Sequence, residues 1–130
     1  MSLDSIAILL GRKGSKGLPG KNTMKILGRP ISHYSIMAAQ NSKYVSEIYV
    51  TTDDEDIMAE ASRFDLNIIE RPDELCTDAA LFEDALIHGY NEAVKRRGKK
   101  PDLVVILMCN VITVDNALID TAIEALRDDP

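Results

Sequence analysis

The chain has 130 residues, with 45% hydrophobic and 28% charged residues, which is the size and composition of one globular domain. Its net charge of −6 argues against a general nucleic-acid binder, and no apolar run approaches the roughly 20 residues that a membrane span requires. The two cysteines, Cys76 and Cys109, form neither a disulfide framework nor a metal-binding spacing, so a cytoplasmic location is expected.

The first predicted strand, Ser5–Leu10, leads directly into a basic, glycine-rich segment at residues 11–22, which reads G-R-K-G-S-K-G-L-P-G-K-N. Glycines let backbone N–H groups approach a ligand closely, and successive exposed N–H groups form a concavity that binds anions. The lysine and arginine side chains add positive charge that suits phosphate oxygens. Because ligands of open α/β sheets bind at the carboxyl ends of strands, the segment predicts an anion site. A solvated basic loop is the alternative.

The distribution of charge along the chain supports a small anionic ligand. Residues 5–46 include seven basic residues and no acidic residue, so this segment carries +7 and the rest of the chain −13. A basic segment in an acidic protein suits a nucleoside triphosphate, whereas a long nucleic acid requires a wider basic surface.

Strands and helices are predicted to alternate after this segment. A short extended piece at Met24–Leu27 ends at a turn formed by residues 28–30. Further strands are expected where β-branched or apolar residues cluster, at Glu47–Thr52, Asn67–Glu70 and Leu103–Met108. Helices are expected at Ile31–Asn41, from an acidic cap at 53–56 to about Phe64, at Ala79–Arg97, and from a cap at Asp115 to about Arg127.

This order predicts an α/β fold in one unit, with a parallel sheet, right-handed crossovers and helices on both faces. Leu103–Met108 is the most apolar strand, so it is expected at the centre of the sheet and buried on both faces. In the last helix, an inner face is expected to include Leu118, Ile119, Ile123 and Leu126.

Two common phosphate-binding motifs are excluded by their spacing. A Walker A loop requires a glycine, four residues and then Gly-Lys-Ser/Thr, but here Gly20-Lys21 is followed by Asn22, and Ser15 stands at the first glycine position. A dinucleotide fingerprint requires glycines at i, i+2 and i+5, which glycines spaced by three residues do not provide. Neither an ATPase nor a nicotinamide enzyme is favoured.

Four motifs in this chain resemble the acylneuraminate (CMP-sialic acid synthetase-like) cytidylyltransferase family. Residues 11–22 are similar to the family signature A-R-G-G-S-K-G-I-P-x-K-N, and 27–31 to L-x-G-K-P-L/I. Residues 50–57 are similar to V-S-T-D-D-x-x-I, and 71–78 to R-P-x-x-L-x-x-D. The motifs follow the family order over most of the chain.

The resemblance implies a Rossmann-like three-layer α/β/α nucleotidyltransferase domain with a mainly parallel sheet. It implies an enzyme that activates an acidic, sialic acid-like sugar with CTP, giving CMP-sugar and pyrophosphate. Arg12 and Lys21 are the implied catalytic residues, since they would hold the triphosphate. The other implied nucleotide-binding residues are Gly11, Lys13, Gly14, Ser15, Lys16, Gly17, Asn22 and Arg71. For Arg71, an ordinary surface or capping role remains the alternative.

The resemblance also implies a Mg²⁺ cofactor, whose ligands are not identified in this chain, and a homodimer of the full-length protein. Family members are longer, so 1–130 is expected to be the N-terminal nucleotide-binding part of a single domain, truncated at its C-terminus and inactive alone. Asp53 and Asp54 are interpreted as helix caps rather than metal ligands. Neither nucleic acid nor a membrane is expected as a partner.

The identity of the sugar stays open at this stage. The family commonly has L-Q-P-T-S-P-L-R after its central strand, whereas residues 107–114 here read L-M-C-N-V-I-T-V, without the glutamine and the closing arginine. Two other functions are retained as alternatives: another sugar-nucleotide nucleotidyltransferase, and a non-catalytic nucleotide-binding domain.

Two further features invite a functional reading, and a structural one is preferred for each. Cys109 has no base beside it in the sequence, so it is expected to be a small packing residue rather than a nucleophile. The basic run at residues 95–100, K-R-R-G-K-K, closes a predicted helix, where cations are stabilised by the helix dipole.

Overall fold

The structure of the chain is a computed structural model that describes residues 4–11, 25–26, 29–72, 82–109 and 115–128. Strands and helices alternate along the chain as predicted. In order, they are β1 (Ser5–Gly11), β2 (Lys25–Ile26), β3 (Arg29–Pro30), α1 (Ile31–Asn41), β4 (Val45–Thr52), α2 (Glu55–Arg63), β5 (Asn67–Glu70), α3 (Phe82–Arg97), β6 (Leu103–Met108) and α4 (Asn116–Asp128). None of the helices in these ranges is long and apolar enough to cross a membrane.

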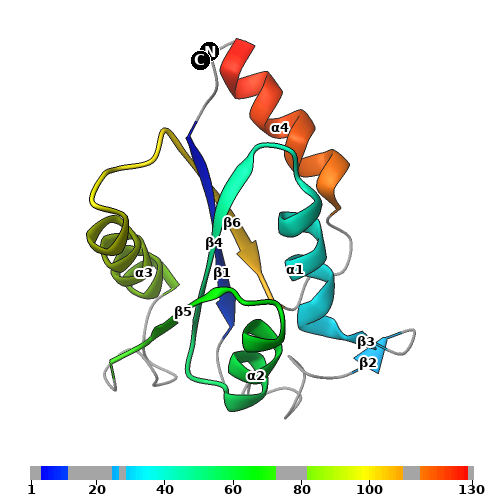
Figure 1. The fold of residues 1–130 in the computed structure, drawn as a ribbon, viewed down its shortest axis with the longest axis vertical. Coiled ribbons are helices and arrows are strands. Elements are labelled where there is room, and N and C mark those ends of the chain that lie inside the picture. The colour runs from blue at the N-terminus through cyan, green and yellow to red at the C-terminus, as the bar shows by residue number, and fades with distance from the viewer. Residues whose placement is uncertain (1–3, 12–24, 27–28, 73–81, 110–114, 129–130) are drawn as a thin grey trace.

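The main sheet consists of parallel strands in the order β5-β4-β1-β6 (Figure 1). Strand β1 lies at its centre and every one of its residues is buried. Ile8, in the middle of β1, pairs with Tyr49 of β4 on one side and with Ile106 of β6 on the other. A short apolar run buried on both faces is the expected sequence of such a strand, and the predicted parallel sheet is therefore confirmed.

The position of β6 corrects one prediction. The sequence predicted this strand at the centre of the sheet, buried on both faces, but β1 occupies the centre and, among the described strands, β6 pairs with β1 alone. Ile106 is 45% exposed and Met108 is 38% exposed. An apolar run indicates which residues avoid water, but the crossover that precedes a strand decides its place in the sheet.

A second correction concerns the segment before α1. Residues 28–30 were expected to form a turn, but Arg29–Pro30 form β3, which pairs antiparallel with β2. Helix α1 begins immediately afterwards at Ile31. Proline at this point is compatible with both structures, because its fixed φ suits an edge strand and the residue before a helix.

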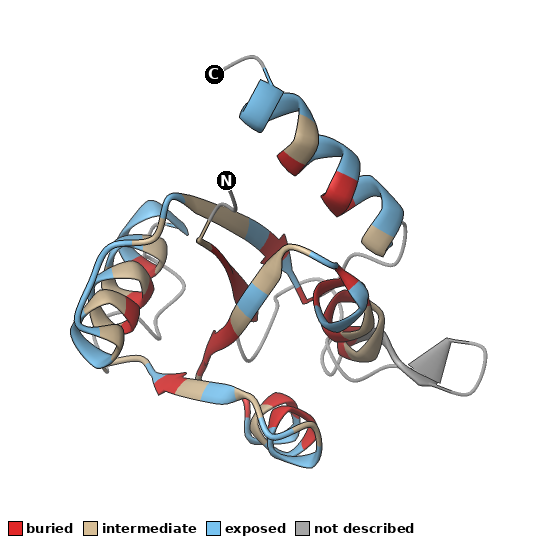
Figure 2. Cartoon of the chain, turned by 45° about the horizontal axis from the view of Figure 1, so that its top comes forward, coloured by how far each residue is buried: buried red, intermediate tan, exposed pale blue. Residues whose placement is uncertain are grey.

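Helices cover both faces of the sheet, which confirms the three-layer α/β/α arrangement. One cluster of buried residues joins α1, α2 and α4 to one face, through side chains such as Ile36, Ile57 and Ile119. The other cluster joins α3 to the opposite face, through Ala85 and Ala93. In Figure 2 the buried residues of the helices lie on the sides turned toward the sheet. This division places α3 alone on its face.

Of the residues predicted to cap helices, Asp54 and Asp115 have this role. The side chain of Asp54 accepts a hydrogen bond from the backbone N–H of Asp56 at 2.9 Å, which makes it the N-cap of α2. Asp115 accepts one from the N–H of Leu118 at 2.8 Å, at the start of α4. Both carboxylates satisfy first-turn N–H groups that have no partner within the helix.

The basic run at residues 95–100 closes α3 as expected, but Arg97 is buried and paired with carboxylates, whereas cations stabilised by the helix dipole were expected. Arg97 ends α3 and its side chain is 3% exposed, because it donates hydrogen bonds to the carboxylates of Asp4 and Glu47. The Nη1 of Arg96 donates to the carbonyl of Ile68 in β5 at 2.8 Å. These contacts tie the end of α3 to the sheet.

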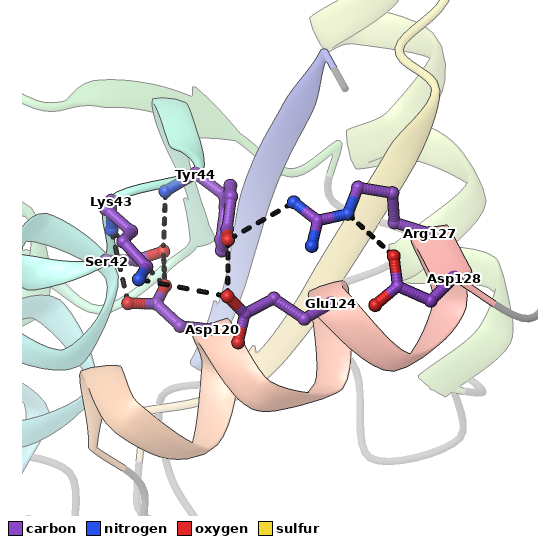
Figure 3. A network of polar contacts seen from close by, with 7 residues as sticks. All are labelled: Ser42, Lys43, Tyr44, Asp120, Glu124, Arg127 and Asp128. Atoms are coloured by element: carbon purple, nitrogen blue, oxygen red, sulfur yellow. Dashed lines mark hydrogen bonds and ion pairs between the residues drawn. The ribbon is translucent and has the colours of Figure 1, made fainter. Parts of the chain in front are cut away.

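Helix α4 is held by polar contacts with the turn that follows α1 (Figure 3). Asp120, which is 8% exposed, accepts hydrogen bonds from the hydroxyl of Ser42 at 2.6 Å and from the N–H of Lys43 at 3.2 Å. One turn further along α4, Glu124 accepts from the hydroxyl of Tyr44 at 2.6 Å. The buried face of α4 is therefore partly polar.

This polar face explains a wrong prediction about α4. Leu118 and Leu126 were expected to face inward, but they are 57% and 54% exposed, whereas Ile119 and Ile123 are buried as expected. The helix is rotated so that Asp120 meets the Ser42 hydroxyl and the Lys43 N–H, and this turns the two leucines outward.

Candidate functional site

The candidate site lies at the carboxyl ends of the four parallel strands, which meet at the lower edge of the sheet in Figure 1. After β1 the chain crosses to β4, and after β5 it crosses to β6 on the other side of β1. In open α/β sheets, ligands bind where the strand order reverses in this way. Gly11 ends β1 at this point, and Cys109 directly follows β6 beside it.

Gly11 is buried at this edge, between α2 and the end of β6. A Cβ atom added to Gly11 would lie 2.6 Å from Cδ1 of Ile57 and 3.0 Å from Sγ of Cys109. The backbone N–H of Cys109 donates to the carbonyl of Leu10 at 2.9 Å, so the two strand ends are also bonded to each other. Gly11 thus allows close packing, and its predicted contact with a nucleotide stays a prediction.

Gly11→Ala is expected to destabilise the fold by about 1–3 kcal/mol, because the new methyl group overpacks a filled core. The atom nearest to that methyl is Cδ1 of Ile57, which Ile57→Val removes. The double variant should therefore lose less stability in urea unfolding than the sum of the two single variants. Strict additivity would contradict the proposed clash.

Most of the residues predicted to bind the ligand lie outside the described residues. This applies to Arg12, Lys13, Gly14, Ser15, Lys16, Gly17, Lys21 and Asn22. Their roles stay predictions. The structure does establish that this segment follows the central strand directly at the carboxyl edge of the sheet.

Arg71 lies at the same edge, with its side chain directed over the end of the neighbouring strand. It follows β5, the outermost strand on its side of the described sheet, and is partly buried. Its Nε donates to Oγ1 of Thr51 at 3.3 Å, and its Nη2 donates to the carbonyl of Thr51 at 3.2 Å. The side chain is therefore held against β4 rather than extended into solvent, unlike an ordinary surface arginine.

Cys109 is 1% exposed, so it packs in the core as the sequence suggested. Burial raises the pKa of its thiol to about 12; the nearby Arg71 opposes this shift and Asp54 adds to it. The thiol is therefore not a nucleophile at neutral pH.

This burial predicts that Cys109 resists alkylation. At pH 8 a thiol with a pKa of about 12 has over a thousandfold less thiolate than an ordinary cysteine with a pKa of about 8.5. Peptide mass spectrometry after treatment with iodoacetamide should find Cys109 unmodified in the native protein and fully modified in urea. Rapid labelling of the native chain would show that the thiol is accessible.

The structure adds buried hydroxyl groups to this edge, and the sequence analysis did not assign them a role. Thr51 and Thr52 are fully buried at the end of β4, and Ser35 in α1 donates to the carbonyl of Met108 at 2.8 Å. The hydroxyl of Ser32, also fully buried, has no hydrogen-bond partner within the part of the chain that the structure describes. Thr51 lies in residues 50–57, which resemble the family pattern V-S-T-D-D-x-x-I, but that resemblance gave no reason to pair Thr51 with Arg71.

No group of three or more His, Cys, Asp or Glu side chains that could hold a metal ion is present among the described residues. Asp54 is 9% exposed and caps α2, and its backbone N–H donates to Oγ1 of Thr52 at 2.9 Å. The carboxylates nearest to the edge are thus arranged for helix capping, so the described part of the chain does not fit a metal site.

Known proteins resemble this chain in sequence. An N-acylneuraminate cytidylyltransferase of Escherichia coli O18:K1:H7 is 41% identical over 86 residues, which are 66% of this chain and 20% of that protein. A 3-deoxy-manno-octulosonate cytidylyltransferase of Bdellovibrio bacteriovorus is 30% identical over 125 residues, which are 96% of this chain and 47% of that protein. The chain therefore spans less than half the length of either relative.

A solved structure has the same fold. CMP:2-keto-3-deoxy-manno-octonic acid synthetase, in complex with CTP, matches with a TM-score of 0.77 and 24% identity, over 98% of this chain and 48% of that one. The family model described as cytidylyltransferase matches residues 6–129. These findings confirm the resemblance that the four motifs indicated. With nearly its whole length matched by that model, the chain belongs to the cytidylyltransferase family.

Proposed function

We propose that this chain binds CTP at the carboxyl edge of its sheet and is the nucleotide-binding part of an enzyme that transfers CMP to an acidic sugar. The observation that carries the proposal is the position of the basic segment. Residues 5–46 have a net charge of +7. They include the segment that follows the buried central strand β1, at the point where the strand order of the sheet reverses. Membership of the cytidylyltransferase family supports CTP as the nucleotide.

In the proposed reaction, a hydroxyl oxygen of the sugar attacks the α-phosphorus of CTP, and the bond from this phosphorus to the departing pyrophosphate breaks. Negative charge grows on the pyrophosphate, so catalysis depends on positioning and on nearby positive charge. Arg12 and Lys21 would supply that charge, with Lys13, Lys16, Ser15 and the N–H groups of Gly11, Gly14 and Gly17 along the triphosphate. Asn22 and Arg71 would hold the nucleoside part.

A divalent cation, Mg²⁺ by family resemblance, would neutralise phosphate charge in such a reaction. The described residues offer no donor set that fits it, so no step is assigned to an ion here. We also propose that residues 1–130 belong to one cytidylyltransferase domain, and that the whole protein is a cytoplasmic homodimer. The acidic sugar is proposed as a class only, since the two sequence relatives are named for different sugars.

The test compares four nucleotides by isothermal titration calorimetry. We expect CTP to bind this chain at least tenfold more tightly than UTP, ATP or GTP. Equal affinities for all four would favour a non-catalytic phosphate-binding domain, and a preference for another nucleotide would favour a different sugar-nucleotide transferase. Tripolyphosphate serves as a control, because it carries the phosphate charge without a base.

A further inference from the structure

We propose that Thr51 is a positioning residue that orients the Arg71 guanidinium toward the nucleotide. The inference rests on the proposed function, because Arg71 gains a nucleotide to contact only if CTP binds at this edge. Thr51 itself is fully buried, so it would act through Arg71 and not by touching the ligand.

Two hydrogen bonds define the direction of the guanidinium group. Nε of Arg71 donates to the side-chain oxygen of Thr51 at 3.3 Å, and Nη2 donates to the main-chain oxygen of the same residue at 3.2 Å. The guanidinium is planar with its N–H donors in a fixed fork, so bonds at two different nitrogen atoms fix both its position and its plane. A single bond would leave the plane free to turn.

The conformation of Thr51 is in turn fixed by packing. Its Cγ2 lies so near α3 that a Cβ atom on Gly89 would approach it to 3.3 Å, and the β-branch restricts χ1. Thr51 also pairs with Leu10 of β1 and Ile69 of β5, inside the sheet. The methyl group held by α3 therefore determines where the hydroxyl of Thr51 points.

Arg71 is thereby directed inward, across the sheet. Its backbone follows the end of β5, yet its side chain reaches the hydroxyl and carbonyl oxygens of Thr51 in β4, and its positive charge opposes the rise in the Cys109 pKa that burial causes. The guanidinium thus lies against β4, the neighbour of β1, and the last residue of β1, Gly11, begins the basic segment 11–22. Without the Thr51 hydroxyl, the hydrogen bond to Nε of Arg71 is lost.

The experiment is a double-mutant cycle on CTP affinity, measured by calorimetry on this chain. Thr51→Val keeps the branched shape and removes the acceptor, and it should weaken CTP binding about fivefold to twentyfold. Arg71→Met should weaken binding at least tenfold. If Thr51 acts through Arg71, the double variant binds CTP no more weakly than Arg71→Met alone. Thr51→Ser keeps the hydroxyl but loses the methyl group that orients it, so its CTP affinity should fall between those of Thr51→Val and the wild-type chain.

Each outcome bears on a different claim. If the wild-type chain shows no preference for CTP, the proposed function fails. If it prefers CTP and Thr51→Val binds like wild type, or if the two substitutions weaken binding independently, Thr51 has no positioning role. The midpoint of thermal unfolding without nucleotide shows whether a variant loses CTP affinity because its fold is less stable. Additive losses of CTP affinity together with a lower midpoint for Thr51→Val would mean that Thr51 serves stability, and would overturn the inference.

Discussion

Replacing Lys21 or Arg12 with glutamine is expected to weaken CTP binding by tenfold to a hundredfold. Hydrogen bonds to a charged group contribute about 1.5–3 kcal/mol, and each 1.4 kcal/mol corresponds to about a factor of ten in affinity. The effect should shrink at high salt, because ions screen the attraction between lysine and phosphate. Calorimetry at two salt concentrations measures both quantities.

The matched control for these variants is Lys100→Gln. Lys100 is an exposed lysine beyond the end of α3, and its replacement changes the net charge of the chain by the same amount. It should leave CTP affinity within twofold of wild type. Equal losses in Lys21→Gln and Lys100→Gln would mean that CTP responds to overall charge, and that the glycine-rich segment is not a specific site.

Asp120→Ala is expected to lower the free energy of unfolding by about 2–4 kcal/mol, because it leaves one buried and one partly buried donor without their acceptor. These donors are the hydroxyl of Ser42 and the N–H of Lys43. The Ser42 oxygen also accepts from the N–H groups of Tyr44 and Val45, at 3.2 and 3.3 Å, so the turn before β4 depends on its orientation (Figure 3). Urea unfolding gives the difference directly.

Asp128→Ala provides the control in the same helix. Asp128 accepts from Nε of Arg127 at 3.1 Å, but its side chain is 69% exposed, and exposed ion pairs contribute about 0–1 kcal/mol. The loss of unfolding free energy in Asp120→Asn should lie between those in Asp120→Ala and Asp128→Ala, because asparagine keeps one acceptor oxygen. A loss in Asp120→Ala as small as that in Asp128→Ala would show that the buried contacts of Asp120 do not stabilise α4.

The local elements were predictable because their signals lie within short segments. The apolar run of β1, the β-branched end of β4 and the caps Asp54 and Asp115 each depend on neighbours in the sequence, and the structure has all of them. The inward face of α4 was partly wrong for the opposite reason. Leu118 and Leu126 fit the apolar spacing of a buried helix face, but both are exposed. The buried face includes Asp120 instead, which accepts a hydrogen bond from Ser42, a residue distant in the sequence.

The candidate site shows the same division between local and distant information. The basic segment after β1 could be recognised from glycine spacing and charge alone. Two sets of contacts could not be recognised in this way: Gly11 with Ile57 and Cys109, and Arg71 with Thr51. Each forms only when elements from different parts of the chain lie side by side. The spacing of residues along the sequence does not predict such contacts.

The sequence by itself determined the alternation of strands and helices and the family, since both follow from short patterns, and it predicted a ligand at the carboxyl edge of the sheet. Only the tertiary structure decided which strand is central. The crossover through α3 takes the chain to the far side of β1, and this places β1 between β4 and β6. The same crossover brings α3 against Thr51, so packing between distant segments sets the direction of Arg71.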